Sequence, residues 1–388
     1  MIRVAFLLNF NQVKWIGGFN IIINLLNSLV AQKTNLKKVK LLIVVNNKNG
    51  LNGLSLNKKI EIIEDKKIFN LNLTRRIIDK LSLILLGKTV FLERFLDQNK
   101  INVITHSNIV SGKNSKTKSI VWIPDFQYLH FPKYFSYKYR FLRYLNLILY
   151  KKHAKIILLS SKDSYKDLKS IININFNNIR IHKFPFYVPP KHKLLKMSLL
   201  RKKYEIPTKY FYLPNQYWVH KNHEIVIKAL LLLMKKNTYL NVVSTGHNFD
   251  YRNSNHFNNI LTLIKKSKLK NYSYLGILPY IDAMSLMKHS IAVINPSFFE
   301  GWSSTVEQAK SYGKKIILSN IKVHLEQSPK DAEYFSPYNY NALSKILLNV
   351  YKKNDLKKNQ NLYNRAQKKM RVNLNKYALQ FYDIIQEI

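Results

Sequence analysis

Short apolar runs alternate along the chain with longer stretches whose apolar residues recur at helical spacing. Runs of about four to eight apolar residues predict buried strands, and recurrence at i, i+3 and i+4 predicts amphipathic helices. The expected strands are Arg3–Leu8, Val39–Val45, Asn102–Thr105, Ser119–Pro124, Lys155–Ser160, Arg180–Phe186, Tyr210–Leu213, Leu240–Ser244, Tyr272–Gly276, Ile291–Ile294 and Lys315–Ser319. The expected helices include Asn20–Leu29, Tyr137–Lys152, Asn222–Lys236, Ile281–His289 and Ser304–Tyr312. This alternation is typical of parallel sheets joined by right-handed crossovers.

A proline-rich segment near the middle, FPFYVPPKHK, separates two series of strands and helices of similar length. Pro185, Pro189 and Pro190 in it predict a boundary between a first domain, residues 1–188, and a second, residues 189–374. A C-terminal helix over about residues 375–388 is expected to pack back on the first domain. The predicted fold class is α/β, with two doubly wound Rossmann-like domains that face each other across a cleft. Ligands of such sheets bind at the carboxyl ends of the strands.

The stretch NPSFFEGWSSTVEQAKSYG follows one predicted strand and enters a helix that starts at Ser304 and ends before Gly313, a C′ glycine. Ser304-x-x-Glu307 fits a capping box, so capping is the first interpretation of Glu307. Glu300 lies in the loop ahead of the helix, where its carboxylate could accept hydrogen bonds from sugar hydroxyls. The backbone amides of Trp302–Ser304, at the positive end of the helix, could hold phosphate.

A second stretch, LPNQYWVHKNH, also leads from a strand into a helix, for which Asn222 is a plausible cap. Lys221 precedes the helix, where a cation is electrostatically unfavourable unless an anion lies beside it. Lys221 is therefore a candidate phosphate ligand, and a solvated surface lysine is the alternative. His220 and His223 have no third metal ligand near them in sequence, so a metal site is not expected.

Two further candidates lie in the first half of the chain. Gly17 and Gly18 in NFNQVKWIGGFN are expected just before a helix, where glycines let the backbone approach a ligand closely. The segment matches neither G-x-G-x-x-G nor a Walker pattern. Asp125 in VWIPDFQYLHFP is a lone carboxylate among apolar and aromatic residues at a strand end, and a turn-forming or helix-capping aspartate is the alternative. His130 in the same stretch could act as an acceptor or base, or could simply pack.

Composition adds both exclusions and an open question. The chain has no cysteine, which excludes disulfides, thiolate metal sites and a cysteine nucleophile. It contains no Asp-x-Asp and no apolar run long enough to predict a transmembrane helix, and MIRVAFLLNF resembles a first strand more than a signal peptide. The formal net charge of +43 favours a polyanionic partner, either a membrane surface or nucleic acid. Scattered bases and a chain rich in Lys, Ile and Asn leave a purely compositional origin open, and no nucleic-acid motif is present.

Four segments together resemble glycosyltransferase family 4, the retaining nucleotide-sugar enzymes with the two-domain GT-B fold. They are WIGG, WIPDFQ, NQYWVHKNH and PSFFEGWSSTVEQAKSYGKKIILS, and they spread over nearly the whole chain. The last two, in this order, are the most specific. The resemblance is strongest to bacterial members that build surface polysaccharides.

The resemblance implies a donor site in which Glu300 and Gly301 face the sugar hydroxyls. It also implies a set of positions around the donor diphosphate: Lys221, Gly17, Gly18, Gln216, Trp302, Ser303 and Ser304. Two positions depart from the family pattern. Many members carry a second glutamate, which binds the ribose, at the position of Gln308; in this chain the nearest glutamate, Glu307, lies one residue earlier. Many members also carry an arginine at the position of Gln216. An amide can still bond ribose, whereas loss of the arginine removes a bidentate phosphate contact.

On the acceptor side, the resemblance implies that Asp125 lies near the donor sugar, with Gln127 and His130 in the same region. The implied mechanism retains the anomeric configuration, and the leaving phosphate helps to deprotonate the acceptor. Neither a metal nor another cofactor is expected.

We therefore expect a glycosyltransferase that moves a hexose or deoxyhexose from a nucleotide-diphosphate sugar to a glycan or lipid-linked glycan in surface polysaccharide assembly. It is expected to be cytoplasmic and peripheral on the inner face of the cell membrane, with an anionic lipid surface and not nucleic acid as a partner. The alternatives are a GT-B relative that acts as a hydrolase, epimerase or phosphorylase, and a basic membrane- or nucleic-acid-binding protein without catalysis.

Overall fold

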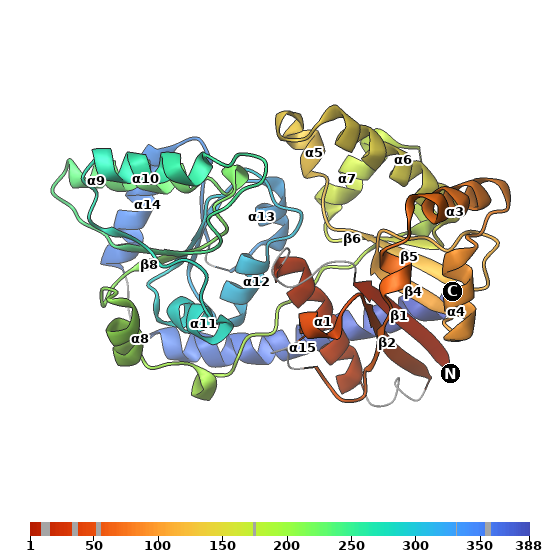
Figure 1. Cartoon of the computed structure of the whole chain (residues 1–388). Helices are drawn as coiled ribbons and strands as arrows, with labels where there is room; N and C mark the ends of the chain where they lie inside the picture. Colours follow the sequence, from red (N-terminus) through yellow and green to blue (C-terminus); the bar gives the residue numbers. More distant parts are fainter. Residues whose placement is uncertain (9–15, 33–37, 52–55, 174–175, 331, 354–357) are drawn as a thin grey trace. The chain divides into compact units, whose positions relative to one another are not determined.

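The computed structural model describes residues 1–8, 16–32, 38–51, 56–173, 176–330, 332–353 and 358–388. The chain forms two compact units (Figure 1). The first contains Met1–Leu129, Ser136–Phe184 and Val372–Ile388, and the second contains His130–Phe135 and Pro185–Arg371. The main division thus falls at Phe184/Pro185, in the proline-rich segment, and the last residues of the chain return to the first unit.

The first unit is built on a parallel seven-stranded sheet with the order β3-β2-β1-β4-β5-β6-β7. Its strands are β1 Ile2–Leu8, β2 Val39–Val45, β3 Glu61–Glu64, β4 Val103–Ser107, β5 Lys118–Ile123, β6 Ile156–Leu159 and β7 Ile179–Ile181. Its helices are α1 Ile16–Ala31, α2 Lys66–Phe69, α3 Leu73–Leu85, α4 Phe91–Gln98, α6 Tyr137–His153 and α7 Lys162–Ile171, with α5 Gln127–His130 ending at the transition to the second unit. Strand order reverses between β1 and β4, which is the ligand-binding position of a doubly wound sheet.

The central strands of this sheet are buried on both faces, as their continuous apolar sequence requires. Alternate residues of β1 and β2, such as Ala5, Leu7 and Leu42, pack on one face against Phe95 and Leu96 of α4. The 3.6-residue repeat of the helix and the two-residue repeat of the strands bring these side chains into one cluster.

The second unit repeats the plan with a parallel six-stranded sheet in the order β10-β9-β8-β11-β12-β13. Its strands are β8 Phe211–Pro214, β9 Val242–Thr245, β10 Tyr272–Tyr274, β11 Val293–Asn295, β12 Ile316–Ser319 and β13 Glu333–Phe335. Its helices are α8 Met197–Tyr204, α9 His223–Met234, α10 His256–Lys266, α11 Tyr280–His289, α12 Ser304–Ser311, α13 Lys322–Gln327 and α14 Tyr340–Lys352, and α15 Lys358–Gln386 continues into the first unit.

Helices α9, α10 and α14 cover one face of this second sheet (Figure 1). Their buried side chains, among them Ile227, Leu230, Ile260 and Leu347, form one apolar cluster with the strands. Strand order reverses here between β8 and β11, which pair through Tyr212 and Val293. This places the second ligand-binding position at the ends of β8 and β11.

The predicted fold class, two doubly wound parallel sheets, is confirmed. Every predicted strand is present, most of them with shifts at their ends, whereas β3 and β13 are absent from the prediction because these short edge strands carry glutamates. One local expectation is wrong: Gly17 and Gly18 lie inside the first turn of α1, because the helix starts at Ile16 and not at Asn20. Within the described ranges, no helix combines the length and apolar character needed to span a bilayer.

Candidate active site

Two loops of the second unit carry the strongest candidate residues, and both begin where strand order reverses. The loop after β8 leads through a 3₁₀ turn, Val219–Lys221, into α9, and the loop after β11 leads into α12. Because β8 and β11 are neighbours, their following loops meet at the same edge of the sheet.

Lys221 and Glu300 form a buried ion pair at this edge. The Lys221 Nζ lies 2.7 Å from Oε1 and 2.8 Å from Oε2 of Glu300. The side chains are only 14% and 8% exposed, respectively. The anion that a lysine before a helix start requires is therefore supplied by Glu300 of the same unit. A pair this well shielded from water interacts far more strongly than a surface ion pair.

Asn222 holds the two loops in this arrangement. Its backbone is left-handed (φ 54°), and its side-chain amide donates to the carbonyls of Pro296 (3.1 Å) and Pro337 (2.9 Å). The expectation that this side chain caps α9 is therefore wrong. Asn222 occupies the N-cap position, but its amide joins the loop after β8 to the loop after β11.

The Glu300 carboxylate also accepts hydrogen bonds from Ser297 Oγ (2.7 Å) and Asn295 Nδ2 (3.3 Å). Burial alone would raise the pKa of Glu300, but the charge of Lys221 and the hydrogen bonds from Lys221 and Ser297 outweigh it. The pKa therefore lies below its usual value, and Glu300 is ionised at neutral pH. A fixed carboxylate with several donors is suited to orient hydroxyl groups.

Ser303, not Ser304, caps α12. The Ser303 side chain accepts from Val306 N, and Ser304 is the first helical residue. The predicted capping box is thus wrong, because the register places a valine where the box needs Glu307. Gly313 ends the helix as predicted, with φ of +62°.

Gln327 of α13 clamps the start of α12. Its amide group accepts from Ser303 N (3.2 Å) and donates to Ser303 O (3.0 Å) and to Glu307 Oε1 (3.0 Å). Lys310 also donates to Glu307 (2.8 Å). A phosphate at the amide of Ser303 would have to displace Gln327. Glu307 is thus linked through Gln327 to the loop that carries Glu300.

Gln308 and Gln216, the two positions that depart from the family pattern, contact other parts of the unit. The Gln308 side chain bonds that of Tyr280 at the start of α11. Gln216 Oε1 accepts from His247 N (2.7 Å) and so joins the loops after β8 and β9. Gln216 therefore has a structural contact of its own in place of the charge that an arginine would supply.

His324 is a site residue that motif reasoning missed. It is fully buried in α13, and its Nδ1 lies 2.9 Å from Ser319 O. Burial lowers the pKa of His324 to about 4, so the ring is neutral at pH 7. Because a carbonyl only accepts, Nδ1 carries the proton and Nε2 is an acceptor. This Nε2 has no hydrogen-bond partner within the described parts of the chain, and the ring interacts electrostatically with Glu300 and Lys221.

The remaining predicted residues are divided between the units. Gly17, Gly18, Asp125 and Gln127 belong to the first unit, where Asp125 Oδ1 accepts from Gln127 N (3.0 Å), the turn-forming contact considered as the alternative. His130 belongs to the second unit, and its ring centroid lies 4.8 Å from that of Phe299, the neighbour of Glu300 in sequence.

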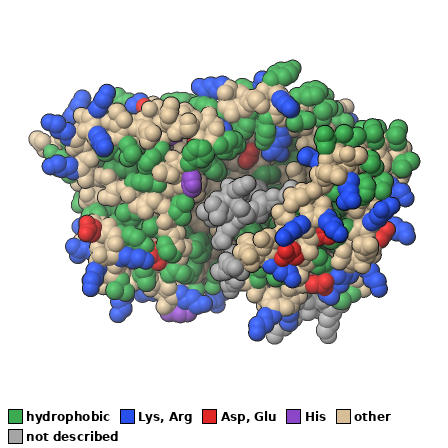
Figure 2. Space-filling view, in the orientation of Figure 1, with side chains coloured by type: hydrophobic (Ala, Val, Ile, Leu, Met, Phe, Trp, Pro, Cys, Tyr) green, Lys and Arg blue, Asp and Glu red, His purple; other side chains and the backbone are tan. Residues whose placement is uncertain are grey.

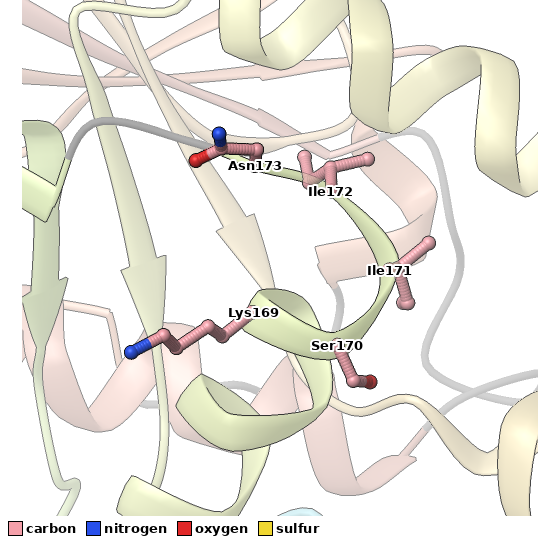
Figure 3. Close-up of a pocket in the computed structure, with 5 residues that line it drawn as sticks. All are labelled: Lys169, Ser170, Ile171, Ile172 and Asn173. Carbon is pink, nitrogen blue, oxygen red and sulfur yellow. The ribbon is translucent and has the colours of Figure 1, made fainter.

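A small depression elsewhere contains none of the predicted residues. It lies at the end of α7 and is lined by Lys169 to Asn173 (Figure 3). The side chains of Lys169 and Ile171 point to opposite sides of the helix end and do not converge. In the ranges that the structure describes, no group of three His, Asp or Glu side chains is placed to hold a metal ion.

The family comparison concerns the second unit of the chain. Residues 198–369 match the family model described as Glycosyl transferases group 1. This matched range contains both Lys221 and Glu300. No curated protein matches the chain by sequence. Among solved structures, a glycosyltransferase from Rickettsia africae ESF-5 is similar over 99% of this chain and 98% of its own, with 15% identity and a TM-score of 0.69.

Two other solved structures are similar over nearly their whole length. Anabaena Alr3699/HepE in complex with UDP-glucose is similar over 100% of both chains, with 14% identity and a TM-score of 0.71. WaaG, a glycosyltransferase involved in lipopolysaccharide biosynthesis, is similar over 97% of this chain and 95% of its own, with 13% identity and a TM-score of 0.59. At these identities the likenesses establish the GT-B fold. Together with the family model, they support a GT-B glycosyltransferase.

Proposed function

We propose that this protein is a retaining glycosyltransferase that uses a nucleotide-diphosphate sugar without a metal ion. The observation that carries the proposal is the buried Lys221–Glu300 pair at the ends of β8 and β11, inside the segment that matches the group 1 family model. The Lys221 ammonium can bind a diphosphate, and the Glu300 carboxylate can accept hydrogen bonds from hydroxyl groups. The pair can therefore bind both parts of a nucleotide sugar, the diphosphate and the sugar.

In the proposed reaction, the donor diphosphate draws Lys221 away from Glu300, and the freed carboxylate accepts hydrogen bonds from the sugar. The bond from the anomeric carbon to the phosphate oxygen then breaks, and Lys221 neutralises the charge that develops on the leaving group. The acceptor hydroxyl bonds to the same face of the anomeric carbon and gives its proton to the leaving phosphate oxygen. Trp302, Ser304, Gly17 and Gly18 are proposed to supply the remaining diphosphate contacts.

For the ribose we propose Gln308, with Glu307 as the second candidate because Gln327 links Glu307 to the Glu300 loop. Asp125, Gln127 and His130 are proposed for the acceptor side.

The proposed donor is a uridine-diphosphate hexose or deoxyhexose, which is consistent with the UDP-glucose complex of the Anabaena neighbour. The proposed acceptor is a glycan or lipid-linked glycan in surface polysaccharide assembly, consistent with the role stated for WaaG. A lipid-linked acceptor would place the protein at the cytoplasmic face of an anionic membrane, where its charge of +43 is favourable.

A thermal-shift series separates the roles of the two paired residues. A ligand that binds only the folded protein raises its melting temperature by mass action. We expect UDP-sugar to stabilise the wild type more than UDP does. Lys221→Gln should bind both ligands about tenfold or more weakly, because a charged phosphate contact is lost. Glu300→Gln should keep the shift with UDP and lose the extra shift due to the sugar.

Each variant in this series is compared with its own ligand-free melting temperature. A loss of the UDP shift in Glu300→Gln, or its retention in Lys221→Gln, would contradict the assignment. Labelled donor with and without acceptor then separates transfer from hydrolysis, since a hydrolase releases free sugar in both cases.

We propose that His324 Nε2 accepts a hydrogen bond from the nucleotide sugar. Two variants test this contact against a purely structural role. In His324→Asn the amide nitrogen takes about the place of Nδ1 and keeps the bond to Ser319, but nothing replaces Nε2. In His324→Gln an amide oxygen reaches about the place of Nε2. We expect nucleotide-sugar binding to weaken about tenfold in His324→Asn and less in His324→Gln.

Calorimetric titration with the nucleotide sugar measures this difference. Equal affinity of the two variants, or weaker binding by His324→Gln than by His324→Asn, would exclude the proposed contact.

A further inference from the structure

Helix α3 of the first unit has its apolar side chains on the outside. Six of them are exposed by 40% to 77%: Leu73, Ile77, Ile78, Leu81, Ile84 and Leu85. The buried residues of this helix are Asp79, Ser82 and Leu83. A helix on the surface of a globular protein normally buries its apolar stripe and exposes its polar side. Helix α3 does the opposite, because it exposes most of its apolar side chains and buries the polar residues Asp79 and Ser82.

Specific polar contacts hold this orientation. Asp79 Oδ1 accepts from the amides of Val90 and Phe91, both at 2.8 Å, and so satisfies the first donors of α4. Asn72 caps the start of α3 through Arg75 N. At the other end, Asn114 donates to Leu86 O (2.9 Å). A rotation of α3 that buried its leucines would break the Asp79 contacts, so the outward apolar face belongs to the folded unit.

A second helix of the same unit has the same character. Helix α6 exposes Tyr137, Phe141, Leu145 and Ile148, which follow one another at intervals of three or four residues and so share one face. The loop that holds the end of α3 also contacts the end of α6, where Lys113 N lies 3.4 Å from His153 Nδ1. Figure 2 shows apolar side chains gathered over the region in which Figure 1 draws α3 and α6.

The charges that accompany this apolar surface have one sign. Arg76 and Lys80 are exposed on α3, Lys138 and Lys151 are exposed on α6, and α6 has no acidic residue. The acidic residue of α3, Asp79, is buried under the helix. A second copy of this chain would bring the same bases against one another. Nucleic acid would leave the leucines and isoleucines uncovered. An anionic lipid surface satisfies both features, because acyl chains accept the apolar side chains and phosphate headgroups the bases.

We propose that the outward faces of α3 and α6, here called the α3–α6 face, bind the boundary between headgroups and acyl chains of an anionic bilayer. The inference rests on the proposed function, because a lipid-linked acceptor gives the membrane contact a purpose. The positive charge of the chain attracts it to an anionic membrane in general. The α3–α6 face adds a defined site on the first unit at which apolar side chains insert into the bilayer.

Vesicle co-sedimentation of the full chain tests the proposal, with phosphatidylcholine vesicles that contain or lack phosphatidylglycerol. We expect the wild type to bind the anionic vesicles in a salt-sensitive manner and the neutral ones weakly. The double variant Leu81→Asp, Ile84→Asp should lose at least about tenfold in affinity for anionic vesicles. Arg76→Gln, Lys80→Gln should lose about tenfold as well. The matched control is Leu379→Asp, an exposed leucine on α15 in the same unit, which should bind like the wild type.

Unchanged binding of the Leu81/Ile84 variant, or equal binding of the wild type to both kinds of vesicle, would overturn the proposal. A cooperative thermal unfolding transition of each ligand-free sample shows that each variant is folded. If the Leu81/Ile84 variant lacks this transition, the Arg76/Lys80 variant replaces it in the test, and unchanged binding of the Arg76/Lys80 variant to anionic vesicles overturns the proposal. Vesicle binding without any nucleotide-sugar thermal shift would support the α3–α6 face and refute the proposed function. A nucleotide-sugar thermal shift without vesicle binding would support the proposed function and refute the α3–α6 face.

Discussion

Glu300→Gln is expected to lower the turnover number by about 10²-fold or more, since the side chain loses the charge that orients the sugar in the transition state. It should also lower the free energy of unfolding by about 3 kcal/mol, because Lys221 is left buried without its counter-ion. The neutral amide can still accept from Ser297, so the loop itself should stay in place. Steady-state kinetics and denaturant unfolding measure the two effects separately.

Stability and catalysis are separated by a second substitution. Lys221→Met combined with Glu300→Gln removes the unpaired charge, so stability should recover while turnover stays low. Glu333→Gln is the matched control, because Glu333 is also paired with a lysine (Lys315, 2.9 Å) but is 45% exposed and outside the site. Turnover of Glu300→Gln within a few-fold of the wild type, or an equal loss in Glu333→Gln, would contradict the proposed role of Glu300.

The fold could be predicted because its strands are buried on both faces and therefore appear as uninterrupted apolar runs. Val39–Val45 is an example, with the same bounds in the prediction and in the structure. Edge strands such as Glu333–Phe335 escape this criterion, because one of their edges faces outward and tolerates charge.

The site could be predicted only in part. Lys221 and Glu300 were recognisable because each follows a strand and precedes a helix, but their direct pairing depends on β8 and β11 being neighbours. The one-residue difference between Ser303 and Ser304 as the cap decides what Glu307 contacts, and spacing alone did not resolve it. His324 lies in no recognised motif, and its unpartnered nitrogen becomes visible only through burial.

Gly246 is a position where the backbone of one loop approaches that of another too closely for any side chain. Its φ is +144°, and a Cβ there would lie 2.3 Å from Asn215 O. Asn215 donates to Asn295 Oδ1 (3.1 Å), and Asn295 donates to Glu300 (3.3 Å). A displacement of the loop after β8 would therefore be transmitted through two hydrogen bonds to the Glu300 carboxylate.

Gly246→Ala is accordingly expected to lower the free energy of unfolding by about 3 kcal/mol, because backbone strain and a clash with another backbone act together. Donor-dependent turnover should fall by more than about tenfold, since small displacements of catalytic groups are costly. Gly276→Ala provides the comparison. Gly276 also has a positive φ, +73°, but a Cβ there would meet only Tyr274 Oη at 4.0 Å, so we expect a loss of about 1 kcal/mol and near-normal turnover. Equal losses in the two variants would show that left-handed backbone strain alone is at work and that the close approach to Asn215 does not position Glu300.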